Sequence, residues 1–121
     1  MTENGEDVIY PKVTDYILET GKSITSIKRR TEALIENGWQ PIGGASTYLN
    51  DKTMIVFTQS LIRTGTSSDS GPKYDIISAL SPTSLADKVK TKLTEDWVPS
   101  GSGFVFRNES GNFIFCQTII H

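Results

Sequence analysis

Apolar residues along this chain change their spacing in a regular way, and the change marks alternating strands and helices. β-rich runs occupy Val13–Thr20 and Lys73–Leu80. After each run, apolar residues recur three or four positions apart, which is the spacing of one helix face. These helical positions are Ile24, Ile27, Leu34 and Ile35 in the first segment and Leu85, Val89 and Leu93 in the second.

The ends of both helices carry recognisable capping signals. Ser23 is a typical N-cap of the first helix, and Gly38 is a typical stop. In the second helix, Ser81 precedes Pro82, and proline is favoured at the first helical position because its missing N–H has no partner there in any case. The sequence therefore predicts helices that begin just after Ser23 and Ser81.

A tryptophan-proline-glycine motif follows each helix. It reads Trp39-x-Pro41-x-Gly43 in the first case and Trp97-x-Pro99-x-Gly101 in the second. Proline stops a helix and glycine permits a sharp turn, so the motif predicts a helix-to-strand corner with tryptophan between helix and sheet. A β-hairpin is expected after each corner. The expected strands are 45–49, 53–62, 103–107 and 112–120, with turns near Asn50 and Asn108.

The two halves of the chain repeat one another at a distance of 58 residues. Residues 16–63 align with residues 74–121 without a gap, and 11 of the 48 pairs are identical. The identical pairs include both tryptophans and both prolines of the corners. We interpret this as two copies of one β-α-β-β unit.

A unit of this size buries little surface alone, so we expect both copies to share one core. The fold class expected is α+β: a six-stranded, mostly antiparallel sheet with two helices on one face and pseudo-twofold symmetry. The expected divisions are a flexible tail at 1–9, a first unit at 10–63, a linker at 64–72 and a second unit at 73–121, all within one compact domain. The linker is rich in Gly, Ser and Thr, which favours flexibility.

Composition narrows the range of functions. The chain has 121 residues, which suits one domain, and its formal net charge is −2. A protein that grips duplex nucleic acid is usually basic, so we expect no duplex partner. No apolar run has the length of a membrane span, and the N-terminus lacks a secretory signal pattern. With one cysteine there is no internal disulfide, and we expect a cytoplasmic protein.

The sequence offers no convincing catalytic or metal site. His121 is the last residue, and a catalytic base must be held in place. Cys116 lies in an apolar strand, which favours a buried, inert thiol. Glu32 and Glu36 are explained by a solvated helix face. We therefore predict no catalytic residues, no metal and no cofactor.

A few repeated or paired residues could have other roles. Gln59 and Gln117 occupy the same place in two apolar strands, where an amide needs partners, and a hydrogen bond to the neighbouring corner would supply them. Arginine beside aromatic rings is a common way to hold a base and a phosphate, although exposed strand arginines are more often simply solvated. On this basis the candidate ligand-binding residues are Arg63, Arg107, Tyr48, Phe104 and Phe106. The structural candidates are Trp39, Trp97, Pro41, Pro99, Gly43, Gly101, Gln59 and Gln117.

The stretch from Gly38 to Ile62 resembles a small bacterial and phage domain of unknown function with the signature G-W-x-P-x-G-G. The resemblance is close in residues 16–63 and departs from the signature in 74–121, where Asp96 replaces Gly38 and Ser102 replaces Gly44. The chain is thus similar to a tandem of that domain. Its size and acidity also resemble phage sponges for nucleotide immune signals, of the Thoeris anti-defence type. That second resemblance implies a non-catalytic homo-oligomer that binds a cyclic nucleotide or a cyclic ADP-ribose derivative.

The sequence therefore favours a phage- or prophage-encoded binding protein that sequesters a small anionic nucleotide-like ligand. A protein–protein interaction module that inhibits a host enzyme is the alternative. An unrecognised enzymatic activity is the third possibility, and the lack of a placed nucleophile and base argues against it.

Overall fold

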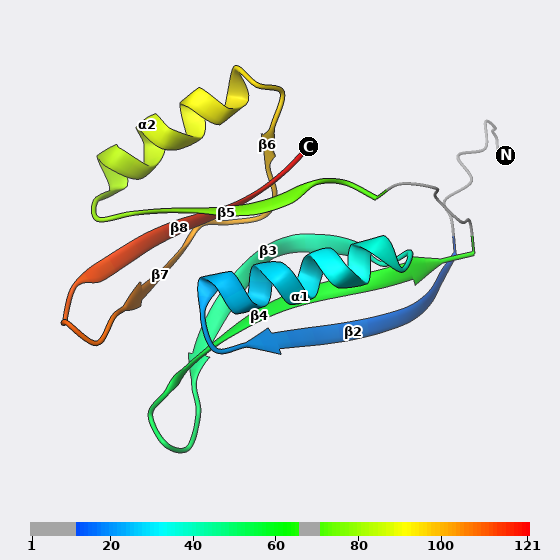
Figure 1. Ribbon diagram of the computed structural model, residues 1–121, viewed down its shortest axis with the longest axis horizontal. Coiled ribbons are helices and arrows are strands. Elements are labelled where there is room, and N and C mark those ends of the chain that lie inside the picture. The colour runs from blue at the N-terminus through cyan, green and yellow to red at the C-terminus, as the bar shows by residue number, and fades with distance from the viewer. Residues whose placement is uncertain (1–11, 66–70) are drawn as a thin grey trace, which may run out of the picture.

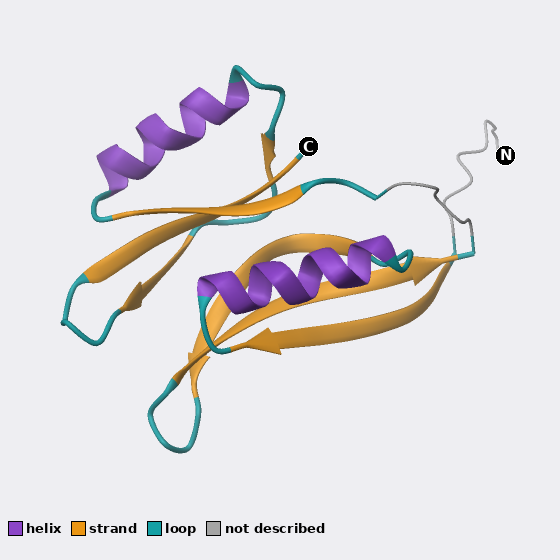
Figure 2. Cartoon of the chain, viewed as in Figure 1, coloured by secondary structure: helices purple, strands orange, loops and turns teal. Residues whose placement is uncertain are grey.

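The computed structural model describes residues 12–65 and 71–121 and consists of a β-α-β-β unit followed by a second unit in which the strand after the helix is divided in two (Figures 1 and 2). The expected tail at 1–9 and most of the expected linker at 64–72 lie outside the described residues. The first unit contains β2 (Val13–Gly21), α1 (Ile24–Glu36), β3 (Gln40–Leu49) and β4 (Ile55–Thr64). The second contains β5 (Tyr74–Ala79), α2 (Pro82–Leu93), β6 (Val98–Pro99), β7 (Phe104–Arg107) and β8 (Phe113–Ile120).

Both helices begin where the sequence predicts. The Ser23 hydroxyl accepts a hydrogen bond from the Ser26 amide at 3.0 Å, and the Ser81 hydroxyl accepts one from the Ser84 amide at 3.1 Å. These side chains satisfy amides that lack an intrahelical partner. After α1, Gly38 has a φ of +93°, and Asp96 takes the same left-handed conformation after α2, with a φ of +70°. The backbone therefore turns in the same way after both helices, although the second unit has Asp96 where the first has Gly38.

The first strand of each hairpin begins earlier than the sequence predicts. β3 starts at Gln40 and runs through the corner, with a break in its pairing to β4 between Ile42 and Ser46. In the second unit the same stretch is divided into β6 and β7. Pro41 is tolerated because β3 is an edge strand, where a missing N–H breaks no ladder.

The strands form two antiparallel sheets where one was expected. The N-terminal sheet has the order β2-β4-β3, and in the C-terminal sheet β8 pairs with β5, β6 and β7. Each sheet has its own helix (Figure 2). If all strands formed one sheet with both helices on the same face, the other face would be exposed to water. Tyr74, Ile76 and Cys116 would then lie on that exposed face. Packing the C-terminal sheet face-on against the N-terminal unit buries all three.

The two units stack head to tail, which corrects the expected pseudo-twofold relation. The C-terminal sheet lies between the N-terminal unit and α2, and it contacts both α1 and β3 of that unit (Figure 1). α1 contacts β5 of the other unit, whereas α2 contacts β5, β6 and β8 of its own sheet. If a twofold axis related the two units, the contact between α1 and β5 would have an equivalent between α2 and β2. Burial shows the same asymmetry: Tyr74 is 2% exposed, and Tyr16, its counterpart 58 positions earlier, is 56% exposed.

One apolar core joins the units. The first unit contributes side chains from one side of α1. It also contributes Phe57 and Leu61, which are buried on the side of β4 that faces α1. The second unit contributes Tyr74, Ile76 and Cys116. Lys28 on α1 also forms an ion pair with Asp75 on β5 at 3.1 Å. The expected shared interior is present.

The repeated glutamines make equivalent hydrogen bonds. Nε2 of Gln59 donates to the carbonyls of Ile42 and Gly43 at 3.1 and 3.3 Å. Nε2 of Gln117 donates to the carbonyls of Ser100 and Gly101 at 3.5 and 3.1 Å, again 58 positions later. Each amide thus supports its own corner. The Tyr74 hydroxyl of the other unit donates to Oε1 of Gln59 at 2.7 Å, and no residue in the described part of the chain does the same for Gln117.

The two tryptophans also have equivalent neighbours. The Arg63 guanidinium lies over the Trp39 ring, 4.7 Å from its centroid. The His121 ring lies edge-on to Trp97, with 5.4 Å between centroids, and His121 is 58 positions after Arg63. Trp39 is buried in the core and Trp97 is half-buried. Each tryptophan therefore packs between its helix end and the last residues of its hairpin.

The corners of the two units touch, which yields a prediction for paired glycines. Gly43 and Gly101 have φ angles of +65° and +70°, but a Cβ on Gly43 would meet nothing within 4 Å, whereas one on Gly101 would meet the backbone of Gly44. Gly43→Ala adds only backbone strain, about 1–2 kcal/mol. Gly101→Ala adds the same strain plus the overlap, so we expect a loss of more than about 3 kcal/mol. Equal losses in denaturant unfolding would contradict this contact.

Candidate ligand-binding cleft

A cavity with a volume of about 630 Å³ lies between the two units. Three segments that are distant in sequence line it: the start of α1, the tip of the β3–β4 hairpin and the end of β7 with the turn that follows. A volume in this range suits a drug-sized or nucleotide-sized molecule. We call this cavity the inter-unit cleft.

The cleft presents positive charge and helix amides on one side. Lys22, Ser23, Ile24 and Thr25 lie along it at the N-terminus of α1. The Ile24 and Thr25 amides have no intrahelical partner, because they belong to the first turn. Helix N-termini favour anions through these amides and the helix dipole. This side of the cleft is therefore suited to a negatively charged group.

Arg107 and Phe106 approach from the second unit. The Phe106 ring meets Phe57 edge-on, with 5.0 Å between centroids and an interplanar angle of 85°. Arg107 is held by a hydrogen bond from Nε to the Gly111 carbonyl at 3.1 Å, and its guanidinium carbon is 5.5 Å from the Phe113 ring centroid. Arg107 is thus held against Phe113, its cross-strand partner, at the edge of the cleft. Glu109, which also lines the cleft, partly offsets the positive charge.

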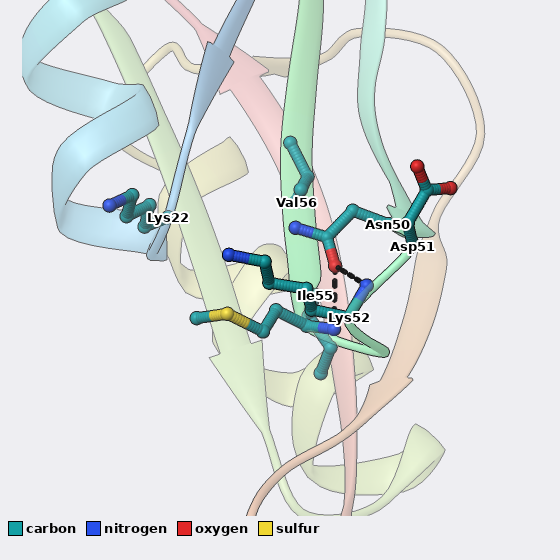
Figure 3. Close-up of a pocket in the computed structure, with 7 residues that line it drawn as sticks. Lys22, Asn50, Asp51, Lys52, Ile55 and Val56 are labelled. Atoms are coloured by element: carbon teal, nitrogen blue, oxygen red, sulfur yellow. Dashed lines mark hydrogen bonds between the residues drawn. The ribbon is translucent and has the colours of Figure 1, made fainter.

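A smaller cavity of about 360 Å³ adjoins the cleft at the β3–β4 hairpin (Figure 3). Lys22, Met54 and Ile55 line both cavities. Oδ1 of Asn50 accepts hydrogen bonds from the Lys52 and Met54 amides at 2.9 Å each, which fixes the turn. Asn50 therefore has the turn role that its repetition suggested.

The structure does not bring the five predicted ligand-binding residues together. Arg107 and Phe106 line the inter-unit cleft. Arg63 lies at the other end of α1, where Nη2 donates to the Asn37 carbonyl at 2.7 Å. That helix has 13 residues, so its ends are about 20 Å apart. Tyr48 is exposed on the N-terminal sheet, and Phe104 lines a different cavity beside α2.

Cys116 and His121 lie away from the cleft. Cys116 is fully buried, and burial raises the pKa of its thiol to about 11. His121 packs on Trp97, and its backbone pairs with Lys73 at 3.0 and 3.1 Å. Within residues 12–65 and 71–121, no group of three or more His, Cys, Asp and Glu side chains could hold a metal ion.

Part of the chain matches a known protein family. Residues 72–121 match a family described as a domain of unknown function (DUF1737). The matched stretch is the second unit, although the resemblance noted in the sequence is closer in residues 16–63. No curated protein and no solved structure matches.

None of the described helices is long and apolar enough to cross a membrane.

Sequence reasoning missed the side of the cleft that α1 supplies. The N-cap at Ser23 was visible, but its position opposite Arg107 depends on how the units stack. Lys22 has no counterpart in the second unit, where the equivalent residue is Leu80, so the repeat gave no signal for it. A cavity between units is a tertiary feature, and no spacing within one unit reveals it.

The buried Cys116 thiol yields a pH prediction. An unfolded thiol ionises near pH 8.5, whereas the folded pKa of Cys116 is about 11. Between these values the unfolded state releases a proton that the folded state keeps, so stability falls as pH rises. Because this thiol ionises only in the unfolded state over that range, we expect it to lower the free energy of unfolding by up to about 1.4 kcal/mol per pH unit. Burial also raises the pKa of Tyr74, which adds to the loss at higher pH.

The measurement is urea unfolding across this alkaline range for the native chain and for Cys116→Ala, whose slope should be smaller. In parallel, the native thiol should resist a disulfide reagent until the protein is unfolded. A native thiol that reacts as fast as free cysteine would contradict the burial.

Proposed function

We propose that this chain is a non-catalytic binding protein that captures a small anionic, nucleotide-like ligand in the inter-unit cleft. The ligand class we favour is a cyclic nucleotide or a cyclic ADP-ribose signal. The proposal includes a phage or prophage origin, action in the host cytoplasm as an anti-defence sponge, and assembly into a homo-oligomer. It also includes an origin of the fold by duplication of one β-α-β-β unit.

The observation that carries the proposal is the composition of the inter-unit cleft. Arg107 and Lys22 supply positive charge, the first turn of α1 supplies free amides, and Phe106 supplies an aromatic surface. Anions are held by charge-assisted hydrogen bonds, and bases pack on aromatic rings. One ligand with a phosphate and a base would use all three features.

A second candidate function rests on a different surface. The face of the N-terminal sheet that points away from α1 exposes Tyr16, Leu18, Ile42 and Tyr48, each between 41% and 56% exposed. We call it the outer face. Exposed apolar patches often mark protein interfaces. This observation favours a module that binds and inhibits a host enzyme, in which case one host protein binds in a fixed ratio and small molecules leave the unfolding temperature unchanged.

Calorimetry with a panel of cyclic nucleotides and cyclic ADP-ribose tests the first proposal. We expect saturable binding by at least one compound, and Arg107→Ala should weaken it. A hydrogen bond to a charged group is worth about 1.5–3 kcal/mol, which corresponds to about a 10- to 100-fold change in affinity.

Arg63→Ala is the matched control, because Arg63 lies at the other end of α1 and should leave the affinity unchanged. Circular dichroism confirms that both variants fold. Absence of heat beyond dilution across the panel, or equal weakening by the two substitutions, would contradict the proposal.

A further inference from the structure

The second unit has a cavity where the first unit is filled. This cavity, about 310 Å³, lies between α2 and the C-terminal sheet and is mainly apolar. Leu85, Phe115 and Gln117 line it. Their counterparts 58 positions earlier, Ile27, Phe57 and Gln59, are at most 3% exposed. The same place is therefore covered in the first unit and open in the second unit.

In the first unit, three contacts from the C-terminal sheet cover this place. The Tyr74 hydroxyl donates to Oε1 of Gln59 at 2.7 Å. The Phe106 ring packs edge-on against Phe57. The Ala45 amide donates to the hydroxyl of Thr118 at 2.9 Å.

The chain carries a second set of residues able to make these contacts. Tyr16, Tyr48 and Ser60 are the counterparts of Tyr74, Phe106 and Thr118, 58 positions earlier. They share the outer face, because Leu18 and Ile42 both pair with Ser60 in the sheet and cross-strand partners point to the same side. Tyr16 and Tyr48 are 56% and 52% exposed.

The receiving residues are also in place. Gln117, Phe115 and Gly103, the counterparts of Gln59, Phe57 and Ala45, all line the cavity beside α2. No described residue of the same chain donates to Oε1 of Gln117, whereas Oε1 of Gln59 receives the Tyr74 hydroxyl. Within one chain, α2 lies on the far side of the C-terminal sheet from the N-terminal sheet (Figure 1).

We propose that a second copy of this chain places its outer face on α2 and the cavity beside it. Within the chain the Tyr16 hydroxyl lies 3.0 Å from Oγ of Ser60. In the proposed contact Ser60 donates to Tyr16, the Tyr16 hydroxyl of one copy donates to Gln117 of the other, and Tyr48 packs on Phe115. The interface repeats, between copies, the contact that already joins the two units.

The contact is head to tail, so it uses a different surface on each copy. Such an interface closes into a ring when the rotation allows it and otherwise extends into a chain. This association between chains does not depend on ligand capture, because the inter-unit cleft is a separate cavity with its own lining.

Sedimentation equilibrium across a wide range of concentration tests the proposal. We expect masses of at least twice the 13.3 kDa of one chain. Tyr16→Lys on the outer face and Ala86→Glu on α2 should each weaken association at least tenfold. Both positions are exposed, so neither change should unfold the chain.

Two matched controls add the same charges elsewhere. Met54→Lys replaces another exposed apolar side chain, at the hairpin tip. Thr91→Glu adds an acid on α2 at a position that does not line the cavity. Both should associate as the native chain does, and unfolding temperatures check that all four variants are folded.

A mixing experiment distinguishes the head-to-tail arrangement. The Tyr16→Lys chain keeps an intact α2 surface, and the Ala86→Glu chain keeps an intact outer face. Each alone should be largely monomeric, and an equimolar mixture should form a two-chain complex. A native chain that stays monomeric, association that Ala86→Glu leaves unchanged, or a chain that instead binds a different protein through Tyr16 would overturn the proposal.

Discussion

The hydroxyl of Tyr74 and the amide of Gln59 meet inside the apolar core, and this contact fixes how the two units stack. Gln59 is 1% exposed and Tyr74 is 2% exposed, so neither polar group has access to water. A buried polar group without a partner is costly, and here each supplies what the other lacks. The surrounding apolar side chains favour contact between the units in general. The hydrogen bond selects one orientation among the ways in which two apolar faces could pack.

This stacking also determines which surfaces are available for function. It sets the end of β7 and the start of α1 along one cavity, the inter-unit cleft, which Arg107 and Lys22 both line. It covers α1 and leaves α2 and the outer face of the N-terminal sheet open. Capture of a small anion and association between copies therefore use separate parts of the same arrangement. A change in the orientation of the units would alter both.

The repeat made the local structure predictable, and the head-to-tail stacking made the rest unpredictable. Ser23 and Ser81 marked the helix starts, and the 58-residue period placed the corners and hairpins in both units. The period gives no information on whether equivalent residues have equivalent surroundings. Tyr16 and Tyr74 look alike in sequence and differ completely in burial. For the same reason Arg63 and Arg107, which looked like one site, lie at opposite ends of α1.

Both units share one core, so we expect them to unfold as one cooperative body. Native-state hydrogen exchange tests this directly at the central strand of each sheet, because the slowest amides report the free energy of global unfolding. The amides of Leu61 on β4 and Ile119 on β8 should exchange with the same free energy, and Gln59→Leu should lower both equally. Exchange of Ile119 through a separate, lower-energy opening, with Leu61 unaffected, would show two independent units and contradict the account.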